Sequence, residues 1–378
     1  MEEALKIGII CHPTAGGSGV VAAELTLALA ERGHELHVFS YERPFRLLEP
    51  RKGIEIHEVA VTRYPLFKYP PYTLALATKL ARICAAQPLD ILHVHYAIPH
   101  AVSAYLCRQM LGPAAPKIVT TLHGTDITLI GFDESFYDIT RFSILESDTV
   151  TAVSESLSLE TRERLDVDRE IEVIMNFVDT DEFSPDKSDP SIRARYARCG
   201  EALIGHMSNF RTTKRLCDVV RVFHRIADRL PARLLLIGDG PDRERARVLA
   251  EELGVAERVV FVGAEEEVAS LLAQLDLFLL PSEKESFGLA ALEAMASGVP
   301  VIANRIGGLP ELVEDSVSGY LTPLKDTAAM ADRAIALLSD RDLHQRFSQA
   351  SLERARVTFS RDAGVERYEA CYRATLAK

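Results

Sequence analysis

The sequence predicts an α/β protein built from two doubly wound parallel sheets. Its 378 residues, of which 47% are apolar, are too many for one ordinary hydrophobic core, so we expect two domains. Short strand-like runs alternate with helix-like runs along the whole chain, which is typical of parallel α/β sheets. A polar, proline-containing segment at residues 178–191 separates the two halves and indicates a linker.

Each half contains about six predicted strands. In the first half they cover residues 5–10, 35–40, 91–96, 117–122, 149–153 and 171–175, with helical patterns at 19–32, 73–86 and 154–165. In the second half they cover residues 202–207, 232–238, 258–262, 275–280, 300–303 and 319–321, with helical patterns at 215–230, 242–253 and 287–297. Ligands of such sheets bind at the carboxyl ends of the strands, so two facing sheets predict one interdomain cleft.

Composition and charge exclude several classes of protein. The net charge of −12 argues against nucleic acid as the main partner, because binding to its backbone needs a basic surface. The six cysteines have no C-x-x-C spacing and indicate reduced thiols in a cytoplasmic protein. The N-terminus lacks the pattern of a signal peptide, and no run approaches 18 apolar residues, so we expect no membrane insertion.

The strongest functional signal is a pair of glutamates, Glu285 and Glu293, that flank the start of a predicted helix. At about 1.5 Å of rise per residue, eight residues separate them by on the order of 12 Å, too far to share a proton or one metal ion. They could hold the two ends of an elongated ligand, and the helix N-terminus between them attracts phosphate. The pattern therefore predicts a sugar–diphosphate–nucleoside ligand.

Two further loops at strand ends indicate anion binding. The first predicted strand leads into G-G-S-G, in which Gly16, Gly17 and Ser18 could contact a phosphate or carboxylate, although a plain strand–helix turn is the alternative. This loop is not a dinucleotide fingerprint, because the next strand ends without an acidic residue. In the second half, Arg211 and Lys214 follow the first strand and predict diphosphate binding, with a solvated basic turn as the alternative.

Histidines and aspartates also lie near strand ends. His123 opens the segment H-G-T-D after a predicted strand, which favours a functional role. His93 and His95 alternate along one strand and so face the same side; without an apparent third ligand, packing is favoured over metal binding. The two D-x-D strings, at 166–168 and 179–181, do not end a strand, so we predict structural roles and no metal.

Together these motifs resemble the retaining nucleotide-sugar glycosyltransferases of the GT-B fold, glycosyltransferase family four. The resemblance covers nearly the whole chain, from G-G-S-G and H-G-T-D through N-F-V-D-T-D-E-F and L-L-I-G-D-G-P-D-R to the two glutamates. It implies two facing Rossmann-like domains: an acceptor domain at 1–178, on which the C-terminal helix at 361–378 packs back, and a donor domain at 179–360. Asn209 stands where the family usually has an arginine, whereas Lys214 keeps its place.

The resemblance also implies roles for individual residues. Glu285 would hold the donor sugar with help from the amides of Phe287, Gly288 and Leu289, and Glu293 would hold the ribose. Arg211 and Lys214 would bind the diphosphate, and His123 would contact the sugar near its 6-hydroxyl. The implied acceptor contacts are Ser18, Tyr96 and Thr121, with Arg141 as a partner for a carboxylate; the implied donor site further includes Gly16, Gly17 and Asn209.

The implied reaction is the transfer of N-acetylglucosamine from UDP-GlcNAc to the 2-hydroxyl of L-malate, with retention and without a cofactor or metal. The family resemblance places this reaction at the first step of bacillithiol biosynthesis. Alternatives are the same chemistry on inositol phosphate, a glucan or a lipid, and a UDP-GlcNAc 2-epimerase. A homodimer is compatible with the sequence, and the aromatic segment at residues 63–72 could be a lid, a subunit contact or a packed loop.

Overall fold

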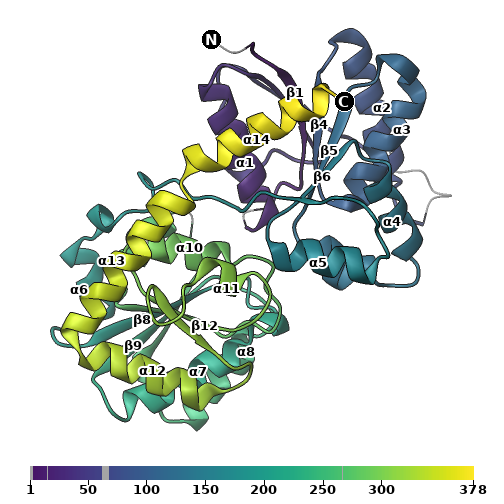
Figure 1. Ribbon diagram of the computed structural model, residues 1–378. Coiled ribbons are helices and arrows are strands. Elements are labelled where there is room, and N and C mark those ends of the chain that lie inside the picture. Colours follow the sequence, from purple (N-terminus) through teal and green to yellow (C-terminus); the bar gives the residue numbers. More distant parts are fainter. Residues whose placement is uncertain (1–2, 15, 62–67, 266) are drawn as a thin grey trace. The chain divides into compact units, whose positions relative to one another are not determined.

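The computed structural model describes residues 3–14, 16–61, 68–265 and 267–378. These fall into two compact units, the first formed by residues 1–176 and 364–378, the second by residues 177–363 (Figure 1). Residues 63–67, the first part of the aromatic segment, lie outside the described residues. Each unit contains one parallel sheet with helices on both faces, so the predicted fold class is confirmed.

The sheet of the first unit has seven parallel strands in the order β3-β2-β1-β4-β5-β6-β7. Their bounds are β1 (Lys6–Ile10), β2 (Glu35–Ser40), β3 (Ile54–Glu58), β4 (Ile91–His95), β5 (Lys117–Leu122), β6 (Thr149–Ala152) and β7 (Glu172–Val173). The sequence analysis missed β3. This strand lies at the edge of the sheet and carries Glu55, His57 and Glu58 among its five residues, so it lacks the continuous apolar run that marks the central strands.

Helices cover both faces of this sheet. Leu76 and Leu80 of α2 (Tyr72–Ala86) pack with Leu92 and Val94 of β4 in one apolar core, to which α3 (Val102–Leu111) also contributes. On the opposite face, α14 (Arg361–Leu376) inserts Tyr372 against β4. The remaining helices are α1 (Ser18–Glu31), α4 (Tyr137–Leu145) and α5 (Glu155–Arg164).

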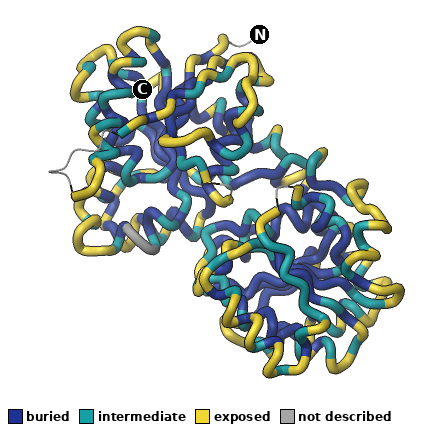
Figure 2. Tube along the Cα trace, turned by 180° about the vertical axis from the view of Figure 1, so that it is seen from behind, coloured by how far each residue is buried: buried dark blue, intermediate teal, exposed yellow. Residues whose placement is uncertain are grey.

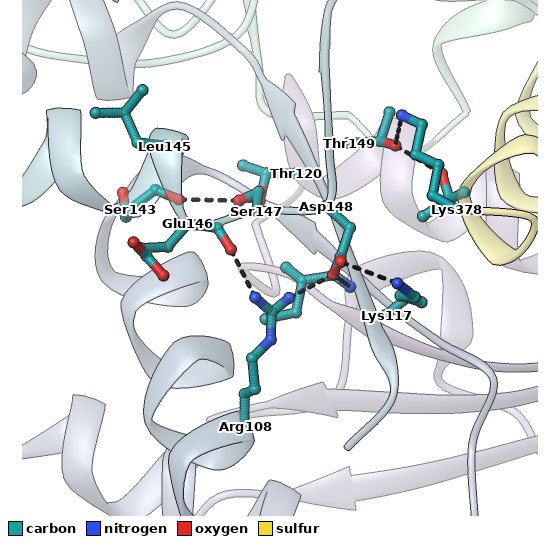
Figure 3. Close-up of polar contacts among 12 residues, drawn as sticks. Arg108, Lys117, Thr120, Ser143, Leu145, Glu146, Ser147, Asp148, Thr149 and Lys378 are labelled. Carbon is teal, nitrogen blue, oxygen red and sulfur yellow. Dashed lines mark hydrogen bonds and ion pairs between the residues drawn. The ribbon is translucent and has the colours of Figure 1, made fainter. Parts of the chain in front are cut away.

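The turn between α4 and β6 is fixed at the amino edge of this sheet (Figure 3). Asp148 pairs with Arg108, accepts a hydrogen bond from the Ile118 N–H at 2.7 Å and lies 3.4 Å from the Lys117 ammonium. Arg108 also donates to the Glu146 carbonyl at 2.8 Å, so it satisfies a carbonyl at the C-terminus of α4. Arg108, Lys117 and Asp148 therefore stabilise the fold. They lie at the amino edge of the sheet, opposite to the edge where ligands of parallel sheets bind.

The second unit has six parallel strands in the order β10-β9-β8-β11-β12-β13. Their bounds are β8 (Ala202–Met207), β9 (Ala232–Ile237), β10 (Val259–Gly263), β11 (Leu277–Leu280), β12 (Val301–Asn304) and β13 (Gly319–Thr322). Its helices are α6 (Pro190–Tyr196), α7 (Leu216–Ala227), α8 (Arg243–Glu252), α9 (Val268–Leu272), α10 (Leu289–Ala296), α11 (Leu309–Leu312), α12 (Thr327–Ser339) and α13 (Arg341–Thr358).

The core of the second unit follows from the apolar spacing of its helices. In α7, Leu216, Val219, Val220, Phe223 and Ile226 recur at helical spacing and are all fully buried. They pack with the inward residues of β8, β9 and β11. Figure 2 shows the strands of each unit as buried trace inside a more exposed outer layer. Across the described residues, no helix is both long enough and apolar enough to cross a bilayer.

Candidate active site

The loops that follow β8 and β11 bring a lysine and a glutamate into contact. The two strands are neighbours in the sheet, so their loops leave its carboxyl edge side by side. Lys214 ends a short helical turn over Thr212–Lys214, and its Nζ lies 2.6 Å from Oε2 of Glu285. Ser282 Oγ donates to the same oxygen at 3.3 Å. Both charged side chains are mostly buried but keep 22% and 14% exposure, so a ligand can reach the pair.

The loop that carries Glu285 is held by the glycines that follow β12. Gly307 has φ of +50°, and a Cβ at this position would lie 1.9 Å from the Glu285 carbonyl oxygen. The Gly308 N–H donates to that carbonyl at 3.2 Å. Asn304 Nδ2 donates to the carbonyls of Pro281 (2.7 Å) and Ser282 (3.0 Å). The sequence analysis missed these supports, although the glycine pair after a predicted strand was an available signal.

The loop after β8 is held in the same way. Gly238 has φ of +118°, and a Cβ there would lie 2.0 Å from the Ser208 carbonyl oxygen. Ser208 Oγ accepts from the Phe210 N–H at 3.2 Å and lies 2.9 Å from Nε2 of His206. His206 Nδ1 donates to the Leu279 carbonyl at 2.8 Å. Burial lowers the pKa of His206 to about 4, so this imidazole is a neutral support at pH 7.

Three cations of this loop, the predicted Arg211 and Lys214 and the adjacent Arg215, have different surroundings. Arg211 is exposed, and its guanidinium forms no ion pair with any residue in the described ranges. Asn209, two residues earlier, is also exposed. Arg215 is already neutralised, because it lies 2.5 Å from Asp218 and 3.2 Å from Glu283. Lys214 pairs with one carboxylate, that of Glu285, whereas Arg215 pairs with two, so Arg211 and Lys214 are the cations of this loop that we expect to bind an anionic ligand.

Helix α10 (Leu289–Ala296) begins four residues after Glu285 and presents an uncapped N-terminus. Its N-cap is Gly288, with φ of +102°, no side chain caps it, and no acidic residue lies in its first turn. Phe287 is buried against the ring of Phe359, with ring centroids 5.7 Å apart, which fixes the chain before the cap. Leu289 is the first helical residue, and Glu293 lies one turn further with 8% exposure. Free N–H groups and the helix dipole thus favour an anion between the two glutamates.

The first unit also has an uncapped helix N-terminus at the carboxyl edge of its sheet. Helix α1 starts at Ser18, which is 8% exposed, and its N-cap Gly17 has φ of +58° with no side-chain cap and no acidic residue in the first turn. Gly16 precedes it and is exposed. These residues follow β1 as predicted, and the N-terminus of α1 is positioned to receive a carboxylate or phosphate.

Beside this helix, the first unit gathers histidines that burial keeps neutral. His95 Nδ1 lies 2.8 Å from His123 Nε2, and His100 Nδ1 donates to the His95 carbonyl at 2.5 Å. The rings of His12 and His100 are 4.4 Å apart. Burial lowers the pKa of His100 and His123 to about 3 and the pKa of His95 well below its usual value. At pH 7 this cluster therefore offers hydrogen bonds without charge.

His123 and Tyr96 are held in place by the backbone around them. Asp126 accepts from the N–H groups of Ala97 (3.0 Å), Gly124 (2.9 Å) and His123 (3.2 Å). Burial raises the pKa of Asp126 to about 6 despite these hydrogen bonds. Tyr96 has φ of +89°, and its ring contacts that of His123 at 5.4 Å between centroids. The H-G-T-D segment therefore acts as a clamp that fixes the orientation of His123.

The side chains of two predicted acceptor contacts form hydrogen bonds within the protein instead of facing a ligand site. Thr121 is fully buried, and its hydroxyl lies 2.6 Å from His93 Nε2 and 2.7 Å from Thr151 Oγ1, so it has no free surface for a ligand. Arg141 Nε donates to the Asp166 carbonyl at 3.1 Å. Asp166 follows the C-terminus of α5, which places this contact at the amino edge of the sheet. Ser18, Tyr96 and Thr121 thus lie at the carboxyl edge, but the Thr121 side chain is buried there, and Arg141 lies at the opposite edge.

The structural interpretations of the remaining motifs agree with the contacts observed. His93 is buried and bonds through Nδ1 to the Tyr372 hydroxyl at 2.7 Å, which confirms that it packs. Asp179 accepts from the Asp181 N–H at 2.9 Å and pairs with Arg361 at 3.2 Å, which fits a structural role for this D-x-D string.

Comparisons with known proteins give the family of this chain. A family model described as Glycosyltransferase Family 4 matches residues 15–182, and one described as Glycosyl transferases group 1 matches residues 189–354. The chain is 48% identical to N-acetyl-alpha-D-glucosaminyl L-malate synthase of Bacillus anthracis, over 97% of this chain and 96% of that protein. It is 30% identical to a D-inositol 3-phosphate glycosyltransferase of Stackebrandtia nassauensis, over 92% of this chain and 85% of that protein.

Solved structures agree on the fold. Sucrose-phosphate synthase from Thermosynechococcus elongatus superposes with a TM-score of 0.83 at 22% identity and covers 99% of both chains. An Anabaena protein solved in complex with UDP and glucose superposes with a TM-score of 0.79 at 19% identity, covering 97% of this chain and 99% of that one. At these identities the likeness concerns the backbone architecture alone.

Proposed function

Since the chain belongs to glycosyltransferase family 4, with the two Rossmann-like domains of the GT-B fold, we propose that it transfers N-acetylglucosamine from UDP-GlcNAc to the 2-hydroxyl of L-malate. The observation that carries this proposal is the 48% identity, over nearly the full length of both chains, to a protein named for that product. The relatives named for inositol phosphate are less similar, at 30% identity or below.

We assign the donor to the second unit. Arg211, Lys214 and the N-terminus of α10 supply the positive charge that a diphosphate needs. Glu285, whose carboxylate Lys214 already orients, accepts hydrogen bonds from the sugar hydroxyls, and Glu293 accepts those of the ribose. The amides of Phe287, Gly288 and Leu289 lie between these two carboxylates in sequence. Gly238 and Gly307 contact the backbone of the two loops that carry Lys214 and Glu285 and so hold these loops in place. This supports the assignment, because little binding energy is then spent on ordering the loops when the donor binds.

We assign the acceptor to the first unit. The N-terminus of α1, with Ser18 in its first turn, takes a carboxylate of malate, and Tyr96 and the neutral His123 donate or accept hydrogen bonds beside it. A dianion bound to a helix N-terminus is stabilised by partial charges, without a formal cation. His123 also reaches the donor sugar in this assignment, near its 6-hydroxyl.

The chemistry follows from these positions. The bond between the anomeric carbon and the β-phosphate oxygen breaks, and a bond from that carbon to the malate 2-hydroxyl oxygen forms on the same face. The hydroxyl proton passes to the departing UDP, so no protein carboxylate has to attack the sugar, unlike the two carboxylates of a retaining glycosidase. Lys214, Arg211 and the dipole of α10 stabilise the negative charge that develops on the diphosphate. The protein contributes mainly orientation and charge stabilisation.

The experiment that tests this function is a matrix of donors and acceptors with the purified protein. UDP-GlcNAc, UDP-glucose and GDP-mannose are each incubated with L-malate, with inositol 3-phosphate or without acceptor, and the products are identified by mass spectrometry and NMR. We expect one product, an α-linked N-acetylglucosaminyl malate. Transfer to inositol phosphate but not to malate would assign another acceptor. A changed sugar released without any acceptor would identify an epimerase.

A further inference from the structure

Two histidines and two glutamates gather on one face of the edge strand β3 and its neighbour β2. The strands are parallel, with His37 opposite Glu55 and Phe39 opposite His57. His37 Nδ1 lies 2.9 Å from His57 Nε2 and 3.7 Å from Glu55 Oε2. One ligand atom from each of His37, Glu55 and His57 falls within 4.8 Å of the others, and no other such group of three occurs among the described residues.

The tautomer of His37 is set by a second carboxylate. Glu35 Oε1 lies 3.2 Å from Nε2 of His37, so this nitrogen carries the proton and Nδ1 carries the lone pair that faces His57 and Glu55. Histidines that bind metals in proteins commonly donate the N–H of one ring nitrogen to a carboxylate, while the other ring nitrogen binds the metal. His37 and His57 are 1% and 5% exposed, so both rings are fixed by packing.

The spacing suits a small tetrahedral ion. Zinc binds nitrogen and oxygen at about 2.0–2.2 Å, which places its ligand atoms about 3.3–3.5 Å apart. The distances from His37 Nδ1 to His57 Nε2 (2.9 Å) and to Glu55 Oε2 (3.7 Å) lie on either side of that value. Small rotations of the side chains would therefore bring these atoms to the spacing that zinc requires. In the metal-free protein, His57 Nε2–H donates to His37 Nδ1. On binding, the proton of His57 moves to its Nδ1, 3.8 Å from Glu55 Oε1, and no proton is released.

We propose that His37 Nδ1, His57 Nε2 and the Glu55 carboxylate form a zinc site on the edge of this sheet, with water as the fourth ligand. Glu55 is 56% exposed, which leaves the fourth position open to solvent. Two imidazoles favour zinc over magnesium or calcium. Glu35 and Glu55 balance the charge of the ion; the nearby cations, Lys6 and Lys79, lie on long side chains that can turn to solvent.

The site is separate from the proposed chemistry. It lies within β2 and β3, whereas the acceptor residues lie at the carboxyl ends of β1, β4 and β5. Because β3 pairs with β2 alone, a metal bridging the two strands would fasten the edge of the sheet. We therefore assign it a stabilising role and expect turnover to be independent of zinc.

The test is metal binding to the full-length protein after removal of metals with a chelator. Zinc is titrated against a chromophoric competitor, and Co²⁺ is used as a spectroscopic probe of the same site. We expect one ion per chain, the visible bands of tetrahedral Co²⁺ with nitrogen and oxygen ligands, and a rise of about 5 °C or more in Tm at a hundredfold excess of zinc over Kd. Glu35→Gln should weaken binding about 10–100-fold, and Glu55→Gln by at least as much.

Two controls keep the outcome decisive. His224→Gln removes a histidine that faces only Asp228, at 3.7 Å, and should bind zinc as the unaltered protein does. Glu55→Gln alters a half-exposed side chain, so its Tm without metal should be unchanged, and loss of zinc binding cannot then be attributed to misfolding. The proposal is overturned by absent binding, by full affinity in Glu55→Gln, or by thiolate-to-metal charge-transfer bands, which would place the ion on cysteine.

Discussion

The two units share one sheet architecture but differ in how they prepare an anion site. At the carboxyl edge of the second unit the cations are formal charges: Arg211 is exposed, and Lys214 is paired with Glu285 at 2.6 Å. At the carboxyl edge of the first unit lie neutral histidines, among them His95 and His123, beside the uncapped N-terminus of α1.

This difference matches what each ligand requires in the proposed reaction. A diphosphate leaving group gains negative charge during transfer, and a formal cation stabilises that change strongly. The acceptor must remain free to move its proton to the leaving group. Neutral imidazoles and a helix dipole can position it at a lower desolvation cost than a buried charged pair would carry.

Acidification should produce the largest difference between the units. His93, His95 and His100 are fully buried, and their folded pKa values lie far below 6.5, so below that pH the unfolded chain binds more protons than the native one. Stability then falls with pH, by about 1.4 kcal/mol per pH unit for each such histidine, down to its own folded pKa, which is about 3 for His93 and His100. In the second unit, His206 is the one fully buried histidine among the described residues, and it lowers stability in the same way as the pH falls to about 4.

One group in the first unit acts in the opposite direction. The folded pKa of Asp126 is raised to about 6, so its protonation favours the native state as the pH falls from 6 to its unfolded value. One carboxyl cannot offset three histidines. Hydrogen exchange at stepped pH, corrected for intrinsic rates, should show β4 and β5 losing protection before β8 and β11. The reverse order would contradict the burial of the histidine cluster.

Lys214→Ala should cause the largest loss of activity. If Lys214 meets the developing charge on the diphosphate, turnover falls roughly two to three orders of magnitude. Lys187→Ala, an exposed lysine of the same unit, is the matched control and should keep normal rates. Steady-state kinetics with both substrates varied separates the outcomes: an effect confined to the KM for malate would remove Lys214 from the donor site.

The contrast between the units could be predicted only in part from sequence. Strand β11 is a continuous apolar run and β8 is apolar except for His206, and the positions of Lys214 and Glu285 after these strands indicated ligand contacts. These two residues are 71 positions apart in the sequence, and their contact depends on the adjacency of β8 and β11, which no local pattern contains. The family resemblance implied Thr121 as an acceptor contact, but this residue pairs with His95 in the register and its hydroxyl bonds the buried side chains of His93 and Thr151.

Gly307→Ala tests whether the backbone behind Glu285 is needed for the donor site. The new Cβ would meet the Glu285 carbonyl, so the loop must shift; a displacement of about 1 Å can cost about 100-fold in rate. Gly254→Ala is the control for backbone strain alone, because Gly254 also has a positive φ, +68°, with no atom within 4 Å of the added Cβ. Gly254→Ala should lose about 1–2 kcal/mol of stability and Gly307→Ala more, but only Gly307→Ala should lose activity. Equal activities would show that the loop is not preorganised by this contact.

Tyr372→Phe should have the smallest effect and tests the neutral network of the first unit. The Tyr372 hydroxyl lies 2.7 Å from His93 Nδ1, and His93 Nε2 bonds Thr121. Removing the hydroxyl leaves a buried ring nitrogen without a partner, which costs about 1–3 kcal/mol of unfolding free energy. Tyr368→Phe is the comparison: that ring also packs on His93, but its hydroxyl lies near Thr121 and Thr151 without a well-aligned hydrogen bond. Urea unfolding should distinguish the two variants.

The activities of these variants decide what the network is for. The Tyr372 hydroxyl reaches His93, which packs beside His95, and His95 in turn bonds His123. If the network only supports the fold, Tyr372→Phe keeps nearly normal turnover at a temperature where it is fully folded. A loss of turnover approaching that of Lys214→Ala would mean that the orientation of His123 is as important as formal charge. The two units would then no longer divide into one that stabilises charge and one that merely positions the acceptor.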